Sequence, residues 1–313
     1  MRLIPLFAIF LDAEDAALTP ATLWSIHSWR WDIGIIGPLV VFAALYVVGA
    51  VRQRNHGWTR HSLFAAGWLS LVFALDSPLH PLGEQLFSAH MLQHEILILV
   101  SAPLIAASHP GATCLWAFMP GQRAKIGSAV HRVESSPVVQ FLIAPLTAWI
   151  IEAVALWGWH IPSLYQATLR SDTVHAAQHL SFFLSALLFW SALYGVGRSA
   201  MNYGTATFYV FGTAVHCSAL GALLTFSTVI WYPAYLKTTS AWGLTPLEDQ
   251  QLGGLLMWVP SGVVFILIGL VLFARWLKES DKRAALGVVQ ALAQQSPAAA
   301  SPSAPPIDET VHK

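Results

Sequence analysis

The chain is poor in charge and in cysteine. Only 10% of its 313 residues are charged, whereas a soluble domain carries about 25%. It has two cysteines, Cys114 and Cys217, and no Cys-x-x-Cys motif, which argues against a disulfide framework or a thiolate zinc site. The formal net charge is zero, so we expect no nucleic-acid partner. No phosphate loop or nucleophile–base pair is evident, and we therefore expect no enzymatic activity.

Apolar and aromatic residues are abundant instead. Hydrophobic residues make up 56% of the chain, tryptophan occurs 14 times, and the mean hydropathy is +0.58. A membrane span needs about 20 apolar residues to cross a core of ~30 Å. The stretches that meet this requirement are 33–51, 61–78, 87–107, 138–157, 176–196, 205–228 and 252–277. Pro103, Pro145 and Pro260 lie inside them and predict kinks.

These stretches predict an all-α fold, a polytopic membrane helix bundle with seven transmembrane helices. We divide the chain into a lead-in (1–32), the membrane domain (33–280) and a disordered cytoplasmic tail (281–313) that is rich in Ala, Pro and Ser. Lys and Arg residues are distributed 12 to 4 between the two sides of this topology. By the positive-inside rule, the N-terminus is outside and the C-terminus is cytoplasmic.

Two His-x-x-x-His pairs begin two of the predicted spans: His90 with His94, and His175 with His179. Residues four apart share one face of a helix, so each pair directs two imidazoles the same way. In the predicted topology both pairs lie at the outer side. Polar groups at membrane depth are costly and are usually functional.

Neutral imidazole is a ligand for copper, zinc, iron and nickel, so the sequence predicts a metal site on the outer face. The predicted metal ligands are His90, His94, His160, His175 and His179. Residues predicted to support them are Asp76, His80, Met91, Glu95 and Met257. A methionine thioether would favour copper in its reduced state.

Three ionisable residues lie deeper in the predicted spans. We interpret His216 as a satisfied core histidine or an interhelical hydrogen-bond donor. Glu95 and Glu152 are acids at membrane depth, which would relay protons, pair with a histidine, or stay protonated and inert.

Residues 77–105, 157–195 and 248–262 resemble the CtaG-type cytochrome c oxidase assembly factor family. The resemblance extends over about 60–280 and rests on the histidine pairs, on WHIPSLY around His160, and on the DQQ motif that begins at Asp249. It implies a seven-helix, multi-pass protein of the bacterial plasma (inner) membrane that takes part in maturation of haem–copper oxidases. It also implies copper as the metal, oxidase subunits and the lipid bilayer as partners, and Asp249 as a further supporting residue. Glu95 departs from the family, which usually has an apolar residue there.

Two alternatives remain open from the sequence. A b-type haem protein would use His94 and His179 as axial ligands on facing helices. A copper or small-solute transporter would need a polar path across the whole membrane, of which Glu152 and His216 are the available candidates.

Overall fold

The computed structural model describes residues 19–23, 25, 29, 32–53, 57–195 and 201–295. Within these ranges the chain is helical and has no β-strand, which confirms the all-α prediction for this part of the chain. The long helices are α2 (Ile33–Gln53), α3 (Trp58–Asp76), α5 (Phe87–Glu95) continued by α6 (Ala102–Ser108), α10 (Pro145–Trp159), α12 (Asp172–Leu193), α13 (Tyr203–Thr225) and α14 (Pro246–Gln295).

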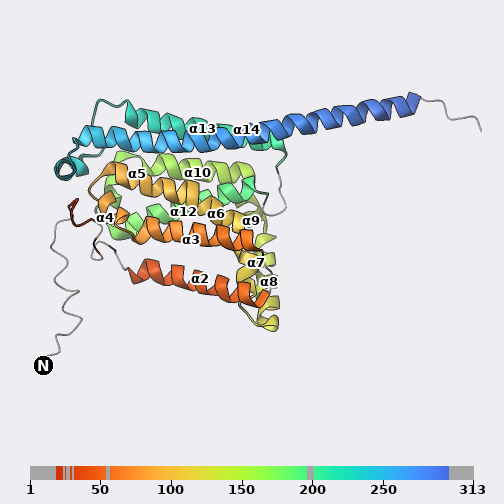
Figure 1. Cartoon of the computed structure of the whole chain (residues 1–313), viewed down its shortest axis with the longest axis horizontal. Helices are drawn as coiled ribbons and strands as arrows, with labels where there is room; N and C mark the ends of the chain where they lie inside the picture. The colour runs from red at the N-terminus through yellow and green to blue at the C-terminus, as the bar shows by residue number, and fades with distance from the viewer. Residues whose placement is uncertain are drawn as a thin grey trace, which may run out of the picture.

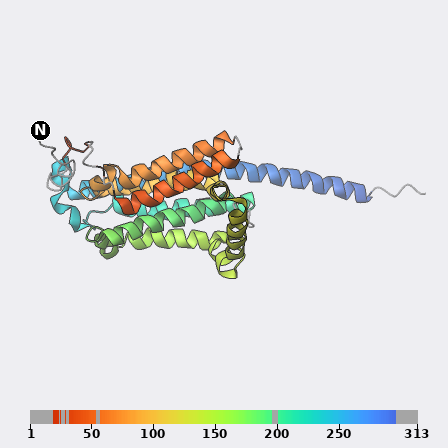
Figure 2. The ribbon, with the colours of Figure 1, turned by 90° about the horizontal axis from the view of Figure 1, so that it is seen from below.

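These helices run side by side, and short helices cover the two ends of the bundle (Figure 1). One end, the α4 end, carries α4 (Leu79–Gly83), α11 (Pro162–Thr168), η3 (Pro233–Lys237) and η4 (Thr239–Trp242). The opposite end, the α8 end, carries α7 (Pro110–Leu115) and α8 (Pro120–Glu134). Figure 2 shows α14 continuing past the other helices as an isolated rod.

The central rod of the bundle is the segment from Phe87 to Ser108, because most of its side chains are buried inside the protein. By contrast, α2 and α14 bury few of theirs, and their large apolar side chains point outward. An apolar outer surface is what a bilayer requires. Gly221 and Gly254 allow α13 and α14 to cross closely, since a Cβ on Gly254 would lie 2.6 Å from the backbone nitrogen of Thr225.

The central rod is interrupted as its proline predicts. Residues Ile96–Ser101 form a π-helical segment, η2, between α5 and α6. Pro103 cannot donate a backbone hydrogen bond and crowds the preceding turn, and a π-bulge is one way in which a helix accommodates this. The Trp190 indole N–H donates to the Ile98 carbonyl at 2.8 Å, so a neighbouring helix uses a carbonyl of the irregular turn.

Among the residues that the structure describes, five helices are long and apolar enough to cross a membrane: Ile33–Gln53, Phe87–Ser108, Asp172–Leu193, Tyr203–Thr225 and Pro246–Leu292. The predicted spans 61–78 and 138–157 do not qualify by that measure. The polar first turn of α3 (Thr59, Arg60 and His61) lowers its hydropathy. The predicted span 138–157 consists of α9 (Pro137–Leu142) and the 15-residue α10, because the second helix begins at Pro145.

The C-terminal boundary also differs from the prediction. Helix α14 continues to Gln295, whereas we expected a disordered tail from residue 281. Its last turns are formed by residues 282–295, KRAALGVVQALAQQ, a stretch that favours a helix. The side chains of these turns are exposed where described. Most of the predicted lead-in (1–32) and the tail after residue 295 lie outside the described residues.

Candidate metal centre

The two histidine pairs lie in the nine-residue helix α5 and in the N-terminal part of α12, at the α4 end of the bundle. Each pair projects from one face of its helix, and the faces meet. The ring centroids are 4.5 Å apart for His90–His94 and 4.4 Å apart for His175–His179. Between the helices, His90 lies 4.9 Å from His175, and His94 lies 5.2 Å from His179. The predicted convergence of the four imidazoles is therefore observed.

A fifth imidazole joins them from the short helix α4. His80 stacks on His175 with a centroid distance of 4.9 Å and meets His179 edge-on at 5.9 Å. We call these five residues the histidine cluster: His80, His90, His94, His175 and His179. Two sets of three have possible ligand atoms all within 4.8 Å, namely His80–His175–His179 and His90–His94–His179.

His94 is a buried residue of this site whose ring nitrogens lack hydrogen bonds within the described part of the chain. It is 2% exposed, and neither of its ring nitrogens has a hydrogen-bond partner among the described residues. Buried polar groups are almost always hydrogen-bonded, because an unmet donor or acceptor costs about 1–3 kcal/mol. A bound cation would satisfy the lone pair of this ring.

Two buried glutamines orient the cluster, and a supporting role was predicted from the sequence for neither of them. His90 Nε2 donates to Gln178 Oε1 at 3.2 Å, which leaves Nδ1 as the nitrogen with the lone pair. The Gln93 side-chain amide donates to His80 Nδ1 at 3.1 Å and also to the Ala74 carbonyl. Gln178 was recognisable in VHAAQH as an amide between two histidines on an apolar helix.

His80 suits the supporting role predicted for it better than a ligand's role. Its Nδ1 accepts from Gln93, and its Nε2 faces the Glu84 carboxylate at 3.7 Å. Both nitrogens are thus engaged. The stronger ligand set is therefore His90, His94 and His179.

His160 lies beside the cluster and outside both ligand sets. Its Nδ1–H donates to the Leu156 carbonyl at 2.6 Å, and its Nε2 lies 3.3 Å from Met91 Sδ. Burial lowers the pKa of His160 to about 4, so the ring is neutral at physiological pH. Because the proton resides on Nδ1, a nitrogen lone pair and a thioether sulfur face each other, an arrangement that suits a soft cation.

Three buried tyrosines close the α4 end. Tyr232 donates to the His160 carbonyl at 2.9 Å, and Tyr235 donates to the Gly83 carbonyl at 2.9 Å. The Tyr165 hydroxyl lies 2.8 Å from that of Tyr235, and its ring lies 5.2 Å from His90. Burial raises the pKa of Tyr165 and of Tyr235 well above the ordinary value, so these hydroxyls stay neutral.

Asp249 holds the helix that carries the first pair. Its carboxylate, from α14, accepts hydrogen bonds from the backbone N–H of Phe87 at 2.6 Å and of Ser88 at 3.1 Å. These are unsatisfied donors of the first turn of α5, which an N-cap side chain from the same helix would ordinarily satisfy. Asp249 supports the site by capping α5 from a distance of 161 residues along the chain.

The other residues predicted to support the site are Asp76, Met257 and Glu95. Asp76 is buried at the last residue of α3, and Met257 packs in the main apolar core with Met91. The Glu95 carboxylate has a buried oxygen without a hydrogen bond among the described residues. It is not a member of the ligand sets found in that part of the chain.

Comparison with known proteins agrees with the resemblance seen in the motifs. Residues 44–279 match the family model described as cytochrome c oxidase caa3 assembly factor. Uncharacterised proteins of Mycobacterium bovis and Mycobacterium tuberculosis are each 26% identical over 271 residues, 82% of this chain. One from Mycobacterium leprae is 26% identical over 268 residues, 81% of this chain. The chain spans 40% of the length of these relatives.

No solved structure gives a significant match. The family model extends from the middle of α2 into α14 and so includes the whole histidine cluster. The chain therefore belongs to the cytochrome c oxidase caa3 assembly factor family.

Proposed function

We propose that this protein binds copper at the histidine cluster and delivers it to a haem–copper oxidase subunit, without catalysing a reaction. The observation that carries the proposal is His94, buried between His90 and His179 with both ring nitrogens lacking a hydrogen bond among the described residues. Family membership supplies the process, and the imidazoles supply the chemistry.

The donor set is suited to moderate binding and release. The two ligand sets consist of imidazoles alone, with no carboxylate in either. Neutral nitrogen ligands bind Cu(I) well but leave its positive charge uncompensated. A protein that passes its ion onward benefits from this, because a fully neutralised and closed site would hold the ion too firmly.

Met91 and His160 extend the proposed site toward the reduced ion. Thioether sulfur is a soft ligand that favours Cu(I), and its distance of 3.3 Å from His160 Nε2 lets both atoms reach one ion. We propose that this pair and the histidine cluster hold copper alternately during loading and delivery. Burial of the Met91–His160 pair and of the histidine cluster keeps water away from the ion.

We also propose that the protein crosses the bacterial plasma membrane seven times. Besides the five long apolar helices, α3 and the α9–α10 segment run between the same two ends of the bundle (Figure 1). The basic residues Arg52, Arg123, Lys125 and Arg132 lie at the α8 end. By the positive-inside rule we propose that this end is cytoplasmic and that the histidine cluster is on the outer side, where oxidase copper sites would be loaded.

The haem alternative is disfavoured by ring spacing. The His94 and His179 rings are 5.2 Å apart by centroid and in edge-to-face contact. Axial ligands of a haem must have the macrocycle between them, and the other imidazoles and Phe182 already occupy the surrounding space, with Phe182 only 4.6 Å from His94. An absorption spectrum of the purified protein without a Soret band is the expected result.

A copper transporter is the second candidate. The observation in its favour is that Glu152 and His216 place ionisable groups in contact near the middle of α10 and α13. Copper uptake into liposomes that contain the purified protein, but not into empty liposomes, would favour transport over delivery.

The test of the proposed function is copper binding with a matched control. Purified full-length protein should bind Cu(I) at one or more equivalents, and the double variant His94→Ala/His179→Ala should lose binding by at least 100-fold. His131→Ala, an exposed histidine on α8, should bind as the wild type does. The same double variant should leave oxidase short of copper in cells that depend on this chain. Normal Cu(I) binding and normal oxidase assembly in the double variant would refute the proposal.

A further inference from the structure

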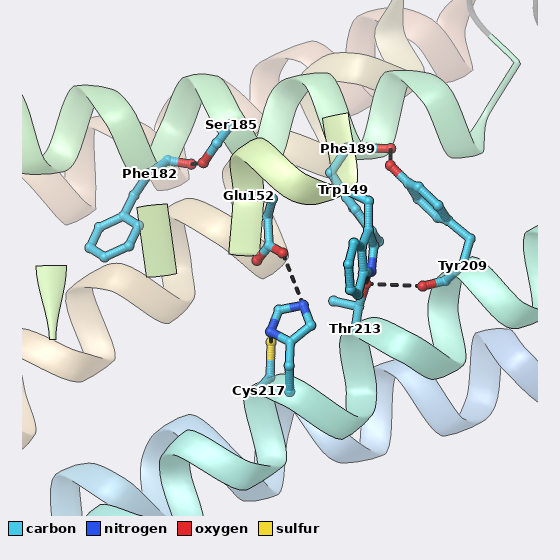
Figure 3. A network of polar contacts seen from close by, with 9 residues as sticks. Trp149, Glu152, Phe182, Ser185, Phe189, Tyr209, Thr213 and Cys217 are labelled. Atoms are coloured by element: carbon cyan, nitrogen blue, oxygen red, sulfur yellow. Dashed lines mark hydrogen bonds and ion pairs between the residues drawn. The ribbon is translucent and has the colours of Figure 1, made fainter. Parts of the chain in front are cut away.

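A second group of potential ligands lies away from the histidine cluster, between α10 and α13. It consists of Glu152, His216 and Cys217, whose ligand atoms all lie within 4.8 Å of one another. Figure 3 shows Glu152 pointing from α10 toward the part of α13 that carries Cys217. We call these three residues the mid-membrane triad, since Glu152 and His216 are near the midpoints of their helices.

The contact between Glu152 and His216 is close but is not a hydrogen bond. Glu152 Oε2 lies 3.3 Å from His216 Nε2, and both atoms are buried without a hydrogen-bond partner among the described residues. Glu152 is only 5% exposed. These two atoms face each other at an ion-pair distance, and because neither has a hydrogen bond in the described part of the chain, both are also available to a shared cation.

The separation of these atoms is what a shared metal ion requires. Nitrogen and oxygen ligands lie about 2.0–2.1 Å from Zn²⁺, so two of them at a tetrahedral angle are about 3.3–3.4 Å apart. The Cys217 sulfur lies 3.8 Å from Nδ1 of the same ring, and one ligand atom from each of the three residues lies within 4.8 Å of the others. Carboxylate, imidazole and thiolate are all common zinc ligands.

We propose that the mid-membrane triad binds a divalent transition-metal ion of the Zn²⁺ type, at a site distinct from the histidine cluster. Binding deprotonates the Cys217 thiol and releases that proton, while Glu152 binds as carboxylate and His216 as neutral imidazole. The two negative ligands balance the two positive charges of the ion. A neutral complex avoids the cost of a net charge in the hydrocarbon region, which is why a divalent ion fits better than Cu⁺.

The neighbouring residues hold the triad in position. The Trp149 indole N–H donates to Thr213 Oγ1 at 3.0 Å, and the Trp149 ring packs edge-on against His216 at 5.3 Å. Gly212 allows this contact, because a Cβ there would lie 3.3 Å from Trp149. Thr213 in turn donates to the Tyr209 carbonyl, as Figure 3 shows. The fourth tetrahedral position has no protein ligand in the triad, and such an open position lets an ion exchange.

The competing explanation is that Glu152 and His216 only join α10 to α13 through a polar contact. Such contacts stabilise membrane bundles, and the 3.3 Å separation is that of an ion pair. Metal binding by the purified protein distinguishes the two explanations.

Co²⁺ is the probe for the experiment, because a thiolate bound to tetrahedral Co²⁺ gives a charge-transfer absorption that imidazole ligands do not. We expect the full-length protein in detergent to show this band with one equivalent of Co²⁺, and Zn²⁺ to displace it. Cys217→Ser should abolish the band, whereas Cys114→Ser, the other free cysteine, should retain it. His94→Ala/His179→Ala should also retain it, which separates this site from the proposed copper function.

A second measurement guards against variants that fold poorly. Glu152→Gln keeps the side-chain volume but removes the charge, and we expect it to bind Zn²⁺ at least tenfold more weakly while its unfolding temperature without metal stays near that of the wild type. Zn²⁺ should raise the unfolding temperature of the wild type and of Cys114→Ser, but not of Glu152→Gln or Cys217→Ser. Absence of the Co²⁺ band in the wild type, or equal Zn²⁺ binding by Glu152→Gln and wild type, would overturn the proposal.

Discussion

The histidine cluster and the mid-membrane triad are opposite solutions to placing metal ligands inside an apolar bundle. The cluster gathers five neutral imidazoles at one end of the helices. The triad combines a carboxylate, an imidazole and a thiol near mid-helix. Neutral ligands cost little to bury but leave the charge of an ion uncompensated, whereas acidic ligands are costly when empty and form a neutral complex when filled.

The two sites are also supported differently. The cluster depends on polar partners that reach in from other elements, Asp249 at the start of α5 and Gln178 beside His90. The triad depends on the packing of Trp149 against α13. Changes that act on one set of supports should therefore leave the other site intact, and the predictions below test this independence in order of decreasing effect.

The largest effect is expected from Asp249→Ala, which uncaps α5. Losing a buried carboxylate that accepts from two backbone N–H groups should lower the free energy of unfolding by about 2–4 kcal/mol. Copper binding at the histidine cluster should weaken in parallel, while the Co²⁺ band of the mid-membrane triad persists in the folded fraction. Thermal unfolding and the two metal titrations measure this, and Glu248→Ala, on the same turn but exposed, is the control.

An acid-dependent loss of stability should come from His160. Its pKa is about 4 in the folded protein and about 6.5 when unfolded, so the unfolded chain takes up a proton first as the pH falls. Stability present above pH 6.5 should thus decline on acidification. Relative to neutral pH, the loss should reach about 2 kcal/mol at pH 5. Measuring the free energy of unfolding of the metal-free wild type and of His160→Gln, above pH 6.5 and at pH 5, isolates the contribution of His160. If the stability of both proteins changes equally with pH, the prediction is wrong.

A smaller effect on copper alone should follow from Gln178→Leu. The substitution keeps the side-chain size but removes the acceptor of the His90 Nε2–H, so the ring loses its fixed tautomer and orientation. Loss of such a second-sphere partner weakens metal binding by about 10–100-fold. We expect about tenfold for Cu(I), with no change in Co²⁺ binding at the triad. If both metals weaken equally, the substitution has disturbed the whole bundle and the two sites are not independent.

The smallest effect is expected from Trp149→Phe, which tests the triad side of the comparison. It removes the hydrogen bond to Thr213, a loss of about 1 kcal/mol, and loosens the ring contact with His216. Zn²⁺ affinity of the triad should fall severalfold and Cu(I) affinity of the cluster should be unchanged. Trp159→Phe removes a comparable indole hydrogen bond, to Ser181, and should leave Zn²⁺ affinity at its wild-type value.

The histidine cluster was predictable because each pair depends only on the spacing of residues within one helix. Pairs such as His90–His94 need only the periodicity of one helix, and topology puts both pairs at the same end. The support by Asp249 and Gln178 was not predictable in this form, since the capping carboxylate comes from a helix 161 residues away and the buried amide acts across helices. The mid-membrane triad was missed for the same reason. Glu152 and the His216–Cys217 pair carry no shared motif, and His216 alone is typical of a core histidine.

The boundaries of the membrane spans were also only partly predictable from the sequence. Hydropathy located the apolar segments, but it could not show that Pro145 begins a separate helix or that η2 interrupts the central rod. It also ended the last helix too early, because local hydropathy does not distinguish an exposed helix from a disordered tail. Helix α14 continues to Gln295 through residues of good helix propensity.

From its residues alone, the chain was determined to be an apolar helical bundle with paired imidazoles at one end, because periodicity and hydropathy are properties of neighbouring positions. Only the tertiary structure decided which of those imidazoles meet, which buried nitrogens stay without hydrogen bonds, and that an acid on α10 faces a histidine and a thiol on α13. Those outcomes depend on how helices distant in sequence pack against one another, and packing is set by side-chain shape over the whole bundle.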